Sequence, residues 1–305
     1  MKQLFHILIG FLLLTGAQAQ MHELGYFGQE PPGLKAELFH GGALVKHPNG
    51  EKRSFNISFS PDGKEMFFSY YKATQEKPNP TYEIKTFKLV DNECIGPKTA
   101  AFSGYHSDVD INYTPDGNYI FFASDRPQPN SKGLDIYYCL KTSNGWSEPI
   151  YAGTKINTDA GEVYPSISQK KNLFFRSSRP GGYGDDDIYR AEWVNGNFIN
   201  VRNLGPNINS IYGESNSVIA PDESYILFCS SRPESNNIQQ IYISFQVGDN
   251  IWTKAVSLGP EINTTAGAGA PTLSPDAKFL FFKKSKEPER GLYWISTEVF
   301  EKLRP

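Results

Sequence analysis

The chain has 305 residues, a formal net charge of -3 and 14% aromatic residues, and it contains 27 glycines and 21 prolines. Abundant aromatic and turn-forming residues indicate many short strands joined by tight turns rather than helices. The length allows one sizeable core, and the lack of a basic excess argues against nucleic acid as a partner.

The N-terminus is predicted to be a signal peptide over residues 1–19. Lys2 precedes an apolar run over 4–14, and Ala17-Gln18-Ala19 is a small-residue cleavage site. The apolar run is too short to span a bilayer, and the sequence has no other candidate span. We therefore expect a mature chain that starts at Gln20, is exported to the periplasm or secreted, and has no transmembrane span.

A pattern of 53 or 54 residues repeats five times after this leader. Its predicted hairpin turns begin at Pro61, Pro115, Ser168, Pro221 and Pro275. Four of these turns contain Pro-Asp, in which proline fixes φ for a turn and aspartate accepts hydrogen bonds from nearby backbone amides. A fixed period of about 50 residues with several short strands per period is typical of a β-propeller.

Each repeat is predicted to contain four strands, named A to D in chain order. In the third repeat, strand A covers 164–167, strand B 172–177, strand C 188–194 and strand D 198–203. Strand D has its own signature, which is an aromatic or aliphatic residue followed seven positions later by glycine. The turns from A to B and from C to D are short, whereas the B–C turns and the D–A linkers are longer and more polar.

The fifth repeat lacks its fourth strand. Its predicted strands cover 271–273, 279–283 and 292–295, and residues 296–303 read as a short helix with an acidic first turn. The signature of strand D recurs at Leu34 to Gly41, near the N-terminus. Because an open ring would leave unpaired strand edges, we expect this segment to complete the last blade.

The predicted fold is therefore an all-β propeller of five four-stranded blades, with six blades as the alternative. We expect residues 20–33 to form an N-terminal extension and residues 34–305 to form a single propeller domain.

Several motifs resemble the TolB-type family of WD-like propeller repeats. They are the Pro-Asp-Gly hairpins, the Ser-Arg-Pro turns, the Asp-Ile-Tyr strands and the Leu-Gly-Pro-x-Ile-Asn linkers at 204–209 and 258–263. The segments 26–34 and 292–295 are also similar to exported, single-propeller members of this group. The resemblance implies a propeller but no single activity, because the group spans envelope proteins, peptidase propellers and oligogalacturonate lyases. This chain departs from TolB in having five repeats instead of six and no room for a preceding α/β domain.

Candidate binding residues gather on the face that carries the D–A linkers and B–C turns, since exposed loops on a rigid scaffold usually carry function. The acidic members are expected to ring the channel mouth at the start of strand A, and the arginines to lie on the B–C turns. The eight predicted residues are His47, His106, Asp108, Glu162, Glu214, Arg126, Arg179 and Arg232.

Structural explanations compete with this prediction. The arginines can pair with the acids that begin strand C in the same blade, Arg126 with Asp135 and Arg179 with Asp187. A metal site made of two histidines and Asp108, or a calcium site at 185–187, is less favoured than surface residues and a solvated turn. We predict no metal and no cofactor.

The expected function is that of an exported, monomeric, non-catalytic binding module for a peptide, protein or glycan at the cell envelope. One alternative is a carbohydrate-active enzyme, either a lyase or a hydrolase. A hydrolase would need two carboxylates roughly 5 to 9.5 Å apart across a sugar. The other alternative is a scaffold subunit of an envelope complex, which would show a large exposed apolar patch.

Overall fold

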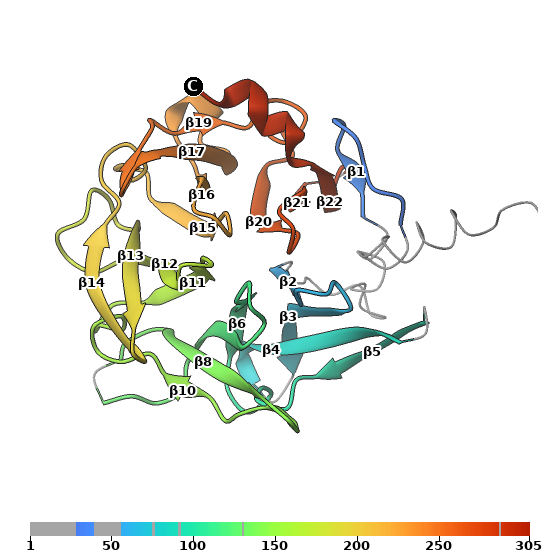
Figure 1. The fold of residues 1–305 in the computed structure, drawn as a ribbon, viewed down its shortest axis with the longest axis vertical. Coiled ribbons are helices and arrows are strands. Elements are labelled where there is room, and N and C mark those ends of the chain that lie inside the picture. The colour runs from blue at the N-terminus through green and yellow to red at the C-terminus, as the bar shows by residue number, and fades with distance from the viewer. Residues whose placement is uncertain (1–28, 40–55, 75–76, 91–92, 130, 287) are drawn as a thin grey trace, which may run out of the picture.

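Five antiparallel sheets stand around a central axis as the blades of a propeller (Figure 1). The computed structural model describes residues 29–39, 56–74, 77–90, 93–129, 131–286 and 288–305. The prediction of a five-bladed all-β propeller is confirmed, and the six-bladed alternative is wrong. The predicted signal peptide lies outside the described residues. In the described part of the chain, no helix is long and apolar enough to cross a membrane.

The strands of the first four blades follow one another in the chain, from the axis outward. The first blade consists of β2 (Ile57–Phe59), β3 (Glu65–Thr74), β4 (Lys77–Val90) and β5 (Glu93–Thr99). The second consists of β6 (Asp108–Tyr113), β7 (Tyr119–Ser124), β8 (Asp135–Thr142), β9 (Gly145–Trp146) and β10 (Ile150–Tyr151). The third consists of β11 (Glu162–Ile167), β12 (Asn172–Ser177), β13 (Asp187–Val194) and β14 (Asn197–Asn203).

The last two blades complete the ring. They are β15 (Glu214–Ile219), β16 (Tyr225–Ser230), β17 (Gln240–Gly248), β18 (Ile251–Trp252) and β19 (Val256–Ser257); and β20 (Ala268–Leu273), β21 (Phe279–Lys284), β22 (Gly291–Ser296) and the N-terminal β1 (Glu37–Leu38). A short 3-10 turn, η1 (Pro233–Ser235), follows β16. The predicted terminal helix is present as the 3-10 helix η2 (Thr297–Leu303), capped by the Ser296 side chain.

The N-terminal segment closes the fifth blade, as the sequence predicts. Strand β1 pairs with β22, and the backbone amide of Phe39 donates to the carbonyl of Leu292 at 2.8 Å. The Phe39 ring is only 1% exposed and packs edge-on against Phe281, with ring centroids 5.0 Å apart. The seam therefore combines a short strand pairing with an aromatic anchor.

The core lies between neighbouring blades. One cluster joins Phe174 and Ile188 of the third blade to Ile219 and Phe228 of the fourth. Strand B of each blade reads as a continuous apolar run because both of its faces are covered by other strands. The hydrophobic effect thus fixes each blade against the next without a separate central core.

A linker asparagine fixes each of three D–A connections. Asn209, the last residue of one Leu-Gly-Pro-x-Ile-Asn motif, accepts from the Ile188 amide at 2.8 Å and donates to the Ile188 carbonyl at 2.9 Å. Asn157 and Asn263 make the same pair of bonds to the second residue of β8 and β17. The linkers are therefore tied to the start of strand C, which holds the loop-bearing face in place.

We predict that replacing Phe39 with alanine lowers the free energy of unfolding by about 3 to 5 kcal/mol, because the change removes a buried ring and leaves a cavity at the seam. Urea unfolding of the purified protein measures the effect. The matched control is Leu38→Ala, since Leu38 is 50% exposed. Equal stabilities for the two variants would mean that the aromatic anchor does not hold the ring closed.

Candidate binding site at the channel mouth

The three predicted carboxylates are buried inside their blades. Asp108, Glu162 and Glu214 are the first residues of β6, β11 and β15, and each is 0% exposed. Each carboxylate forms an ion pair with the arginine of its own B–C turn. Asp108 pairs with Arg126, Glu162 with Arg179 at 3.5 Å, and Glu214 with Arg232 at 3.1 Å.

Each arginine also holds the preceding linker. Arg232 donates to the Ile208 carbonyl at 2.5 Å, and its guanidinium lies over the rings of Phe228 and Tyr242. Arg126 and Arg179 repeat these contacts with the carbonyls of Phe102 and Ile156. We call this unit, made of the strand-A acid and the B–C arginine, the arginine latch. It ties strand A, the B–C turn and the D–A linker together.

The predicted pairing of arginine with the strand-C acids is therefore wrong. The partner is the acid of strand A, which lies closer because the turn folds back over the start of that strand. Asp187 instead accepts from the Tyr183 amide at 2.6 Å and the Asn203 side chain at 2.7 Å. Burial raises the pKa of Asp108 and Glu214, and the arginines oppose that rise.

His106 does not pair with these carboxylates in the described structure. His106 is partly exposed on the linker before β6, with Nδ1 3.6 Å from a carboxylate oxygen of Asp125. His47 lies outside the described residues. Among the described residues, no group of three or more His, Cys, Asp or Glu side chains could hold a metal ion, so the acidic run 185–187 forms no such group.

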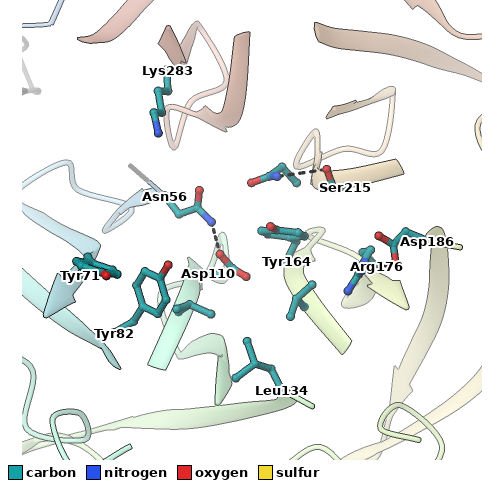
Figure 2. Close-up of a pocket in the computed structure, with 13 residues that line it drawn as sticks. Asn56, Tyr71, Tyr82, Asp110, Leu134, Tyr164, Arg176, Asp186, Ser215 and Lys283 are labelled. Atoms are coloured by element: carbon teal, nitrogen blue, oxygen red, sulfur yellow. Dashed lines mark hydrogen bonds and ion pairs between the residues drawn. The ribbon is translucent and has the colours of Figure 1, made fainter. Parts of the chain in front are cut away.

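A cavity of about 710 Å³ opens at the channel mouth, on the face that carries the B–C turns and D–A linkers (Figure 2). We call it the cup. Its lining, from the first blade to the fifth, is Asn56, Tyr71, Tyr82; Val109, Asp110, Leu134; Val163, Tyr164, Arg176, Asp186; Ser215, Asn216; and Lys283. Of the eight predicted residues, the seven that the structure describes lie outside the lining of the cup, although the face is the expected one.

A β-bulge in strand A directs side chains toward the axis. The pairing of strands A and B shifts register in the second to fifth blades, and the bulged residue has a positive φ: 58° at Asp110, 55° at Tyr164, 47° at Asn216 and 48° at Ala270. A left-handed conformation is uncommon for residues other than glycine. Bulges of this kind often re-aim a side chain near a functional site.

The cup has a narrow floor. Below it, between Asn56, Asp110, Tyr164 and Asn216, the channel holds only about 30 Å³ of space. Near the opposite face it holds about 60 Å³. The channel therefore narrows sharply below the cup, and most of its space lies on the loop-bearing face.

Charged groups of both signs line the cup. Asn56 donates to Asp110, and Arg176 pairs with Asp186 (Figure 2). Burial raises the pKa of Asp110 to about 7, although the Asn56 hydrogen bond and the Arg176 charge oppose the rise. Asp110 therefore changes its charge near neutral pH.

Aromatic residues form the opposite wall. Strands β3 and β4 are the longest in the molecule as described, and their hairpin extends beyond the other B–C turns. Tyr71 and Tyr82 face each other across it with ring centroids 5.5 Å apart. Val109 and Val163 pack against Tyr82, together with Leu134 and Tyr164. The first blade thus gives the cup a wall that the other blades do not have.

Sequence reasoning missed the cup because it assigned the channel to the first residue of strand A. The bulge places the residue two positions later at the axis instead. One signal was available: the five equivalent positions, Asn56, Asp110, Tyr164, Asn216 and Ala270, hold four different residue types while their apolar neighbours repeat.

Comparison with known proteins supports the fold. No family model matches this chain, and no curated protein matches it in sequence. Similar solved structures include the tricorn protease (TM-score 0.52, 15% identity, 80% of this chain and 21% of that one) and an α-L-arabinofuranosidase from Podospora anserina in complex with cellotriose (TM-score 0.51, 10% identity, 87% and 96%). A TolB-like protein from Agrobacterium tumefaciens matches with a TM-score of 0.49 and 18% identity over 74% of this chain and 68% of that one. At these identities the similarity shows the propeller fold alone.

We predict that Arg232→Met lowers the free energy of unfolding by about 3 to 5 kcal/mol, because it leaves the Glu214 carboxylate buried without its cation. The matched control is Arg202→Met, which removes a half-exposed pair with Glu192 and should cost less than about 1 kcal/mol. Denaturant unfolding of both variants measures the difference. Similar losses would show that the arginine latch is no stronger than a surface ion pair.

We predict that Asp110 makes stability depend on pH. Its folded-state pKa of about 7 lies above the ordinary value of 3.8, so the folded protein binds this proton more tightly than the unfolded chain. Its contribution to the free energy of unfolding falls as pH rises from about 4 to about 7, by up to roughly 1.4 kcal/mol per pH unit, and is constant above that.

The measurement is urea unfolding of wild type and Asp110→Asn between pH 4 and pH 8. Other carboxyl groups titrate equally in both proteins, so the difference between the two curves isolates Asp110. A difference that stays constant across this range would contradict the prediction.

Proposed function

We propose that this protein is an exported, monomeric, non-catalytic binding module of the TolB type that captures one end of a peptide, protein or glycan in the cup. The signal-peptide pattern supports export to the periplasm or the medium, and the repeat motifs support the TolB type. The proposal requires no metal and no cofactor.

The proposal rests on one observation: the residues that line the cup do not follow the sequence repeat that the rest of the propeller follows. The arginine latch and the linker asparagines recur from blade to blade, as expected for groups that hold a scaffold together. The cup lining follows no such repetition, and it unites three tyrosines with amides and charges of both signs. A concave site of several hundred Å³ with a few convergent polar groups is the usual form of a ligand site.

The residues predicted from sequence have a supporting role in this proposal. The arginine latches set the positions of the turns and linkers that surround the cup, so Arg126, Arg179 and Arg232 act on binding through loop geometry. His106 lies outside the cup lining and would contact only a ligand that extends beyond the cup.

Glycan hydrolysis is the second candidate. It is favoured by Asp110, whose pKa of about 7 suits a general acid, together with Asp186, a second carboxylate that lines the same cavity. In that case Asp110→Asn would abolish turnover of chromogenic glycosides while glycan binding persists. In a binding module, wild-type protein releases no chromophore.

We predict that Tyr82→Ala weakens capture on peptide and glycan arrays by about tenfold or more, since stacking on an aromatic ring contributes roughly 1 to 2 kcal/mol to ligand binding. The matched control is Val194→Ala, which changes an exposed residue at the C–D turn, away from the cup. If Val194→Ala loses the ligand and Tyr82→Ala retains it, the binding surface is the opposite face and the proposal fails.

A further inference from the structure

A second cavity lies on the face of the propeller opposite to the cup, between the A–B turns of the second and third blades. Its volume of about 170 Å³ suits one small group rather than a whole peptide or oligosaccharide. We call it the turn pocket. The lining residues that matter here are Pro115, Asp116 and Tyr119 of the second blade and Gln169, Lys171 and Trp193 of the third.

The A–B turn of the third blade differs from the other four. Its closing hydrogen bond runs from the Lys171 amide to the Ser168 carbonyl at 3.0 Å, so the structure places Gln169, not Ser168, where the other turns have proline. Proline has no N–H, whereas the Gln169 amide donates to the Pro221 carbonyl at 2.8 Å. The third turn is therefore tied to the turn of the fourth blade.

Two further contacts hold the third turn to the fourth blade. The buried Glu223 carboxylate accepts from the Ser168 hydroxyl at 2.6 Å and pairs with Lys170 at 3.6 Å. On the other side, a side chain at Gly117 would come within 3.0 Å of Pro61, so the second turn packs closely on the first. The second and third turns are each held by the neighbour on their far side, and the turn pocket lies between them.

Tyr119 and Trp193 form an aromatic wall of the turn pocket. Their rings meet edge to face with centroids 4.6 Å apart, and both residues are partly buried. Both also pack against the core cluster of the second and third blades, which fixes their positions. The Lys171 ammonium lies 6.0 Å from each ring centroid. The pocket therefore offers apolar surface close to a hydrogen-bond donor.

Three polar side chains surround this wall. Burial alone would raise the pKa of Asp116, but hydrogen bonds from Thr114 and Asn118 and the charge of Lys171 lower it, so its carboxylate is an acceptor at neutral pH. Gln169 supplies an amide that both donates and accepts, and Lys171 supplies an ammonium that only donates. Asp116, Gln169 and Lys171 are all exposed, so a ligand can reach them from solvent.

This combination fits a neutral sugar ring better than other small groups. An aliphatic side chain or a proline ring would cover the aromatic wall but leave the donors and acceptors without partners. A cation would approach Lys171 and an anion would approach Asp116, so a like charge disfavours either. A sugar has an apolar ring face for the wall, and each of its hydroxyls can donate to an acceptor and accept from a donor.

We propose that the turn pocket binds one neutral sugar ring, which packs on Tyr119 and Trp193 and forms hydrogen bonds with Asp116, Gln169 and Lys171. This inference does not rest on the proposed function of the cup, since the two sites lie on opposite faces. The ring can be the end of a glycan or a free monosaccharide, because both offer the same chemistry. A ligand with so few atoms binds weakly, and we expect a dissociation constant of about 1 to 10 mM.

The test is 19F nuclear magnetic resonance at pH 7 on the full chain labelled with 5-fluorotryptophan. The chain has four tryptophans, and the Trp193 resonance is the one that is lost in Trp193→Phe. The probes are the methyl glycosides of glucose, galactose and mannose, with cyclohexanol as a six-membered ring that has only one hydroxyl. We expect at least one glycoside to shift the Trp193 resonance alone, and cyclohexanol to bind about tenfold more weakly.

A disaccharide of the bound sugar distinguishes the two sources. If the natural ligand is the end of a glycan, the disaccharide should bind as tightly as the methyl glycoside, because its second ring lies outside the pocket. If the natural ligand is a free monosaccharide, the disaccharide should bind more weakly.

The variants Gln169→Ala and Lys171→Met should each weaken glycoside binding by about fivefold or more, as expected for a lost hydrogen bond. Gln169→Ala keeps the backbone amide that binds Pro221, and Lys171→Met keeps an unbranched side chain at a φ of 62°. The matched control is Lys170→Met, which removes the lysine that pairs with Glu223 and lies outside the lining of the turn pocket. Melting curves check that each variant is folded.

The inference is wrong if no glycoside shifts the Trp193 resonance, or if cyclohexanol binds as tightly as the glycosides. Binding that survives both variants places the sugar elsewhere and also overturns it. Tyr82→Ala should leave the Trp193 shift unchanged, because Tyr82 lines the cup on the other face. Millimolar binding is too weak to be retained on an array, so array capture still reports on the cup, and each proposal can fail without the other.

Discussion

The buried ion pair between the strand-A acid and the arginine of the B–C turn is the interaction on which the loop-bearing face depends. In three consecutive blades the arginine binds the acid, a linker carbonyl and two aromatic rings at once. Removing either partner would leave an unpaired charge buried away from water, which is strongly destabilising. The ion pair therefore holds the B–C turn in place. The arrangement differs in two blades: the fifth has Ala268 in place of the acid and places Lys283 at the cup, and the first has the long β3–β4 hairpin in place of a short turn.

The bulge in strand A brings side chains of this rigid scaffold to the lining of the cup. A positive φ in a residue other than glycine or asparagine costs of order 1 kcal/mol or more, and Tyr164 and Ala270 both adopt it. The hydrogen-bonded neighbours impose the conformation: the Asp110 amide, for example, donates to the Ser69 hydroxyl of the preceding blade. The bulge recurs in four blades, so it belongs to the repeated scaffold, and at Asp110, Tyr164 and Asn216 it brings the residue to the lining of the cup.

The sequence predicts the architecture well because the residues that hold the blades together repeat at a fixed interval. The repeat shows the Pro-Asp turns and the apolar B strands directly. The N-terminal strand β1, just before Phe39, is recognised because it carries the same signature as the D strands of the repeats. The site is harder to predict for the same reason. Its residues are the ones that do not repeat, and their direction depends on a bulge that no local pattern marks. Asp108 and Asp110 are two positions apart in one strand, yet the first is locked in a latch and the second lines the cup. Only the observed backbone separates these roles.

The narrowing of the channel limits what kind of recognition is possible. The space between Asn56 and Asn216 is only about 30 Å³, whereas the cup above it holds about 710 Å³. The part of a ligand that the cup recognises is therefore the part that enters from the loop-bearing face. Since the latches fix that face and the bulges fix the floor, most of the cup is formed before a ligand arrives. The binding energy is then available for discrimination among ligands, because little of it is spent on ordering the site.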